Sequence, residues 1–101
     1  MAKPTQPLSN DDRALILTPN TYVVSRTMGA QTLILDPTRD EIRQLNEVGT
    51  FIWSMILKSE YTKDDVLNAV IQNFETPSDV ALADLEEFLN ELDSVSLIRM
   101  G

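Results

Sequence analysis

Side chains that can do acid–base chemistry are mostly carboxylates in this sequence. The 101 residues include 16 Asp and Glu but no His and no Cys, so the imidazole base, the thiolate nucleophile and the usual zinc and haem ligands are missing. Two adjacent carboxylate pairs, Asp64 with Asp65 and Glu86 with Glu87, would be the candidates for catalysis. Adjacent residues on a helix point about 100° apart, so neither pair converges on one atom. We therefore predict no catalytic residue, no metal site, no cofactor and no enzymatic activity.

A serine near the C-terminus suggests one other kind of chemistry. Asp93, Ser94 and Val95 resemble the Asp-Ser-Leu site at which carrier proteins are modified. Only six residues follow Val95, and a carrier needs further helices after its modified serine. We therefore expect no carrier function.

The acidic residues are concentrated in the C-terminal half. The net charge is −8; residues 1–59 hold six acids and six bases, whereas residues 60–101 hold ten acids and two bases. Such a surface repels phosphate backbones and anionic lipids, so we predict no nucleic-acid or membrane partner. No apolar run reaches the roughly 18 residues that span a bilayer, and no secretory signal begins the chain. We expect a cytoplasmic protein.

The first half of the chain predicts a short tail and three strands. Residues 1–13 contain two Pro among small polar residues and predict a flexible tail, followed by one domain over residues 14–101. Residues 22–27 and 31–36 are predicted to form a hairpin around Gly29. The second run is apolar enough for a central strand that is covered on one face and partly on the other. Asp36 and Pro37 predict a turn into a third strand at residues 41–45, whose charged residues suit a sheet edge.

The second half has helical periodicity. Asn46 is a good N-cap for a helix that ends near Leu57, and Trp53 on this helix is expected to lie in the core of the domain. Thr62 with Asp65 predicts a capping box for a second helix. Ser78 can cap a third helix, and residues 97–100 predict a short extended end. The expected fold class is α+β, with a three-stranded antiparallel sheet followed by three helices.

The third helix has a second, partly apolar face. Ala81, Asp84, Phe88, Glu91 and Val95 lie one residue behind its leucine stripe. Phe88 either widens the core stripe or lines a groove beside it. The helix carries six acids and no base, so a groove on it favours a cationic ligand.

These patterns together resemble a known family. The chain is similar to PqqD-like precursor-peptide recognition elements of ribosomally made, modified peptides, most of all to stand-alone members from lasso-peptide clusters. The resemblance rests on Leu45-Asn46-Glu47-Val48-Gly49, Ile52-Trp53, Tyr61-Thr62, Asp84-Leu85, Phe88-Leu89, Leu92 and Leu97-Ile98. Family members often carry an aromatic pair where this chain has Ile42 and Arg43.

The resemblance implies a winged-helix-like fold that binds a leader peptide as an added strand beside the third strand and against the third helix. A partner then processes the bound precursor; in lasso-peptide clusters this partner is a leader protease. Carried onto this sequence, the implied peptide-binding residues are Glu41, Ile42, Arg43, Gln44 and Leu45 on the strand and Ala81, Asp84, Leu85, Phe88 and Glu91 on the helix.

Two other functions and two oligomeric states stay open at this point. The chain is alternatively a peptide chaperone for a radical SAM enzyme in quinone-cofactor biosynthesis, or a winged-helix DNA-binding regulator, although its third helix lacks the bases that DNA needs. It is either a monomer or a homodimer paired through the edge strand.

Overall fold

The structure is a computed structural model and describes residues 15–100. In chain order its elements are β1 (Leu17–Pro19), β2 (Val24–Met28), β3 (Gln31–Asp36), β4 (Glu41–Leu45), α2 (Glu47–Ile56), α3 (Lys63–Phe74), α4 (Ser78–Ser94) and β5 (Ile98–Met100). The predicted α+β class, with an antiparallel sheet followed by three helices, is confirmed. The tail predicted over residues 1–13 lies outside the described residues.

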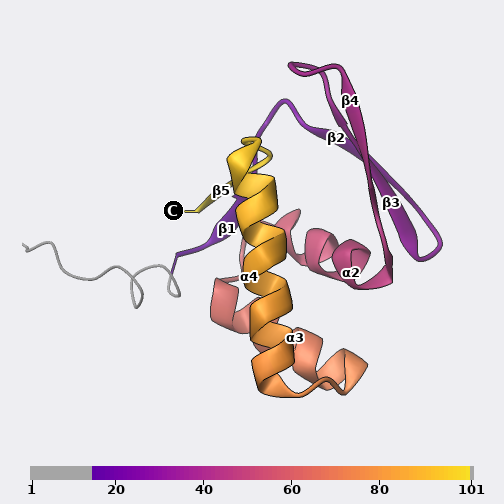
Figure 1. The fold of residues 1–101 in the computed structure, drawn as a ribbon. Coiled ribbons are helices and arrows are strands. Elements are labelled where there is room, and N and C mark those ends of the chain that lie inside the picture. The colour runs from indigo at the N-terminus through magenta and orange to yellow at the C-terminus, as the bar shows by residue number, and fades with distance from the viewer. Residues whose placement is uncertain (1–14, 101) are drawn as a thin grey trace, which may run out of the picture.

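The three-stranded sheet has the order β2-β3-β4, with both pairs antiparallel (Figure 1). Along β3, burial alternates with the period of two that a strand imposes: Thr32, Ile34 and Asp36 are buried, whereas Leu33 and Leu35 are exposed. Helix α2 packs against the first of these faces. The apolar run predicted a strand covered on one face and partly on the other; among the described residues the second face is instead open.

A small second sheet joins the two ends of the domain. β1 pairs antiparallel with β5, with Thr18 opposite Arg99, and the hydroxyl of Tyr22 donates to the carbonyl of Ser96 over 2.6 Å. The extended C-terminal end was predicted correctly, but β1 was not predicted. It has only three residues and ends in Pro19, so neither alternation nor propensity marks it.

Two of the three N-caps predicted from the sequence are present in the structure. Asn46 accepts a hydrogen bond from the Gly49 N–H at 2.8 Å, and Thr62 and Asp65 form the predicted capping box. The prediction that Ser78 caps α4 is wrong. Pro77 occupies the N-cap position without a side-chain bond, and Ser78 is already the first helical residue, so its hydroxyl is not placed to cap the free N–H groups.

The core lies between the inner face of the sheet and the three helices. Trp53 is fully buried, as predicted, and its indole N–H donates to the hydroxyl of Ser25 on β2 at 3.0 Å. The leucine stripe of α4 packs into the same core through Leu85, Leu89 and Leu92. These contacts hold α2 against the sheet. Helix α4 packs along α3 and ends next to β5 (Figure 1). Within residues 15–100 no helix has both the length and the apolar character to cross a membrane.

Candidate functional site

The outer strand of the sheet is open along one edge. β4 pairs with β3, and no other strand among residues 15–100 pairs with β4 (Figure 1). In an antiparallel sheet alternate residues direct their N–H and C=O groups toward each side, so a strand of five residues leaves about four to six main-chain groups free. The predicted edge strand is thus present, with room for one further strand.

The side chains of β4 divide between the two faces of the sheet. Arg43 and Leu45 point to the helix side, where Leu45 is buried. Ile42 and Gln44 have the opposite parity and lie on the outer face, where the Gln44 amide donates to Gln31 at 3.2 Å. Neither Ile42 nor Gln44 faces α4, so an added strand would meet β4 mainly through its backbone.

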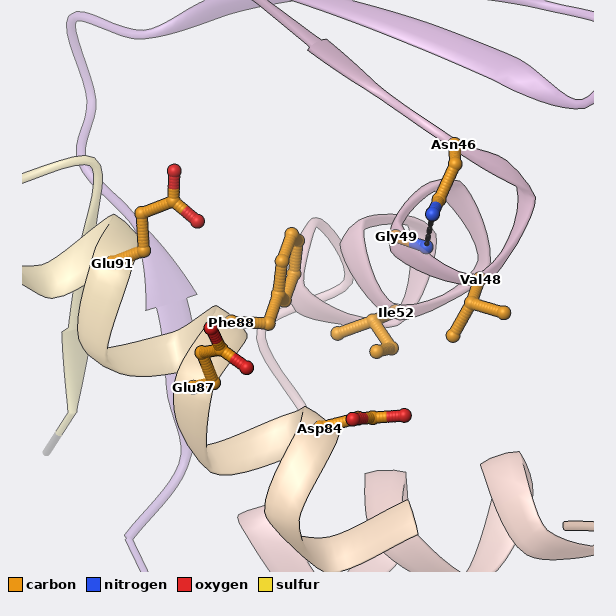
Figure 2. Close-up of a pocket in the computed structure, with 8 residues that line it drawn as sticks. All are labelled: Asn46, Val48, Gly49, Ile52, Asp84, Glu87, Phe88 and Glu91. Carbon is orange, nitrogen blue, oxygen red and sulfur yellow. Dashed lines mark hydrogen bonds between the residues drawn. The ribbon is translucent and has the colours of Figure 1, made fainter. Parts of the chain in front are cut away.

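A groove lies between the first half of α2 and the middle of α4, at the point where β4 ends (Figure 2). Its volume is about 380 Å³. The lining residues come from two walls: Asn46, Val48, Gly49 and Ile52 from the start of α2, and Asp84, Glu87, Phe88 and Glu91 from α4. We call it the α2–α4 groove.

Phe88 stands in this groove with its ring directed toward α2 (Figure 2). A Cβ atom added to Gly49 would lie 3.3 Å from Cε1 of Phe88 and 3.3 Å from Cβ of Leu45. Such contacts are tighter than ordinary packing, so glycine at position 49 is what lets the ring approach the helix this closely. Phe88 is half-buried and packs against the core. Both interpretations of Phe88 hold, because one side of the ring faces the core and the other faces the groove.

The rim of the α2–α4 groove is acidic on one side. Asp84, Glu87 and Glu91 are exposed on the α4 wall, while Val48 and Ile52 form an apolar wall opposite (Figure 2). Glu91 accepts a hydrogen bond from the guanidinium of Arg43 at 2.6 Å, which links β4 to α4. Asp84 and Glu87 form no ion pair within the described part of the chain. The groove therefore suits a ligand with an apolar side chain and a nearby positive charge.

The structure separates the helix residues that the sequence grouped together. Asp84, Phe88 and Glu91 do line the groove, but Ala81 and Leu85 are core residues, each 1% exposed. Ala81 and Leu85 therefore do not line the groove, and their part in peptide binding stays a prediction.

Several groove residues were missed because they come from α2. Asn46 was predicted as an N-cap, Val48, Gly49 and Ile52 entered only through the family resemblance, and Glu87 was considered only as a catalytic carboxylate. The Asn-Glu-Val-Gly segment was the available signal, since a glycine early in a helix costs stability and needs a packing reason.

A second hollow, of about 480 Å³, lies between the end of α2 and α3. Its lining includes Asp65, whose carboxylate is already held by the N–H of Thr62 in the capping box. No strand residue lines this hollow, whereas the α2–α4 groove begins where the open strand β4 ends, so the α2–α4 groove is the better candidate for a binding site.

Fold and site together define a small α+β domain with a vacant sheet edge next to an acidic, partly apolar groove. A family model described as "Coenzyme PQQ synthesis protein D (PqqD)" matches residues 31–98, which is more than half of the chain. The chain belongs to the PqqD family.

Among solved structures, the chain is similar to one described as "TbiB1 in Complex with the TbiA(beta) Leader Peptide". The TM-score is 0.75 at 21% sequence identity, and the match covers 81% of this chain and 94% of the other. That likeness shows a shared fold. No curated protein sequence matches the chain.

Proposed function

We propose that the chain binds the leader segment of a ribosomally synthesised precursor peptide as a fourth strand on β4 and presents it to a processing enzyme. The observation that carries this proposal is the free edge of β4 beside the α2–α4 groove. Family membership supports it, as does the fold shared with a protein that was solved with a leader peptide.

The free edge supplies affinity that depends little on sequence. About four to six main-chain hydrogen bonds would each contribute roughly 1 kcal/mol net. One or two apolar side chains of the leader, buried in the groove, would each add about 1.5–3 kcal/mol. Ordering the leader costs about 2–5 kcal/mol and association costs more, so the expected dissociation constant is micromolar or slightly lower.

The groove supplies specificity. A leader strand beside β4 would direct alternate side chains toward the helices, where Phe88, Val48 and Ile52 can hold an apolar or aromatic side chain. Asp84 and Glu87 favour a Lys or Arg close to that anchor. A leader with both features would be preferred over one with acidic residues at those positions.

The chain acts in this proposal as a binder and not as a catalyst. Holding the leader raises the effective concentration of the rest of the precursor at the enzyme that processes it. We infer that this enzyme is a leader protease of a lasso-peptide pathway, because the Asn-Glu-Val-Gly and Ile-Trp segments are typical of the stand-alone members of such clusters.

A second function is a peptide chaperone for a radical SAM enzyme in quinone-cofactor biosynthesis. The description of the matching family model favours it. The binding event is the same in both functions, and the partner differs. Adding either purified enzyme to the preformed complex of chain and precursor distinguishes them: leader cleavage supports the first function, and modification of the uncleaved precursor supports the second.

Calorimetric titration tests the binding step itself. The titrant is a synthetic leader peptide from the precursor encoded beside this chain, with a peptide of the same composition and scrambled order as the control. We expect saturable binding near micromolar for the leader and at least tenfold weaker binding for the scrambled peptide. Equal heats from both peptides, or none from the leader, would refute the proposal.

A further inference from the structure

The face of the sheet that points away from the helices carries an exposed apolar patch. Val24, Leu35 and Ile42 lie side by side across β2, β3 and β4, because the register pairs Val24 with Leu35 and Leu35 with Ile42. Leu33 and Met28 extend the patch along the strands. Val24, Met28 and Ile42 are 58%, 60% and 68% exposed, so this face is open in the described part of the chain.

The patch accounts for most of the large apolar side chains that residues 15–100 expose. The others, Tyr22, Leu57 and Val80, are scattered over the molecule. A contiguous patch of a few hundred Å² on one face is the usual sign of a protein interaction site, whereas single exposed side chains are ordinary.

The charge of this face is opposite to that of the α2–α4 groove. The polar side chains on the outer face are Arg26, Gln31 and Gln44. By the register of the three strands, no Asp or Glu in their middle points to this face. Arg26 is exposed and forms no ion pair within residues 15–100. This face therefore suits a partner protein whose contact surface is apolar and carries a carboxylate.

A second copy of the chain fits this face poorly. A symmetric dimer would bring two Arg26 side chains together and join two molecules of net charge −8. Charge therefore favours a partner other than a second copy of the chain.

The patch ends on the strand that is proposed to receive the leader. Ile42 and Gln44 belong to β4, so a leader strand added at its free edge would place alternate side chains in the same outer face. The added strand would widen the patch by one row and present leader residues directly beside Ile42.

We propose that the outer face of the sheet β2-β3-β4 is the docking surface for the processing enzyme, and that the bound leader forms part of that surface. This inference rests on the proposed function. The enzyme contacts Val24, Leu35 and Ile42 through apolar side chains and places a carboxylate near Arg26. Because the leader supplies part of the surface, leader and enzyme each strengthen the binding of the other.

The test compares two double variants in the full chain. Val24→Thr with Leu35→Thr removes apolar surface from the outer face on β2 and β3 while keeping residues that favour strands. Leu57→Thr with Val80→Thr removes exposed apolar surface elsewhere. The binding partner is the purified leader protease or modifying enzyme encoded beside the chain, titrated by biolayer interferometry onto chain saturated with leader peptide.

We expect the outer-face variant to bind the enzyme about tenfold more weakly or worse, and the control variant to bind within about twofold of the parent. Arg26→Glu should also weaken enzyme binding, and Lys58→Glu, with the same change in net charge, should not. Both double variants should bind leader peptide within about twofold of the parent, because neither changes a residue of β4 or of the α2–α4 groove.

The outcomes separate this inference from the proposed function. If the parent chain binds no leader, the proposed function fails. If it binds leader but the outer-face variant binds enzyme as the parent does, the docking surface is wrong while the proposed function stands. Sedimentation of the parent as a dimer that Val24→Thr with Leu35→Thr dissociates would assign the face to a second copy and would also overturn the inference.

Discussion

Replacing Phe88 by alanine removes the aromatic side chain that stands in the α2–α4 groove. The ring faces Gly49 and lies across from Val48 and Ile52 (Figure 2). A leader side chain fully buried there would gain about 1.5–3 kcal/mol. Phe88 has the largest apolar side chain among the residues that line the groove, so its loss should cost about 1–1.5 kcal/mol of binding free energy. The dissociation constant should rise about five- to twelvefold.

The same substitution also affects folding, and that effect must be measured separately. Phe88 is half-buried, so truncation should lower the free energy of unfolding by about 1–2 kcal/mol, less than the 3–5 kcal/mol of a fully buried Phe. Far-ultraviolet circular dichroism and urea unfolding establish that the variant is folded at the temperature of the binding assay.

Val80→Ala is the matched control for Phe88→Ala. Val80 lies on the same helix, is 46% exposed and does not line the groove. Its replacement should leave leader affinity within about twofold in the same calorimetric titration. If folded Phe88→Ala binds leader as tightly as the parent chain does, the groove is not the anchor site and the reasoning about α4 is refuted.

Three further experiments test the charges and the core. Asp84→Lys should lower the affinity for a cationic leader severalfold, whereas Asp93→Lys, an equal charge change outside the groove, should leave it unchanged. Equal effects of the two substitutions in titrations at low salt would show that only the net charge matters. A double-mutant cycle with Arg43→Met and Glu91→Gln, measured by urea unfolding, should give a coupling free energy of about 0.2–1 kcal/mol. This coupling should disappear in 1 M salt, because both side chains are partly exposed. A larger coupling that does not depend on salt would contradict this expectation. Leu85→Ala should cost about 2–5 kcal/mol of stability by the same measurement, and a cost below 1 kcal/mol would contradict its place in the core.

The sequence predicted those elements whose local signals agree with their tertiary contacts. Thr62 with Asp65 forms the expected capping box, and Trp53 lies where helical periodicity places it. β1 was missed because three residues ending in Pro19 depend on pairing with β5, a contact between distant parts of the chain. Ser78 was misassigned because Pro77 already fits the N-cap position.

The candidate site was predicted less completely than the fold. The border between the core face and the groove face of α4 depends on what packs beside it, so periodicity alone could not separate Leu85 from Phe88. The contribution of α2 could not be foreseen either, because the role of Gly49 follows from its contact with Phe88, a residue 39 positions away in the sequence. A strand edge and a groove become one site only once the fold joins them.

Amide hydrogen exchange along β4 tests the central claim most directly. The measurement follows the N–H groups of residues 41–45 by nuclear magnetic resonance, with and without saturating leader peptide. The N–H groups that face the free edge should exchange at least tenfold more slowly when the leader is bound, while those in the first turn of α3 should be unchanged. Tight leader binding that leaves exchange along β4 unaltered would contradict the proposed addition of a strand.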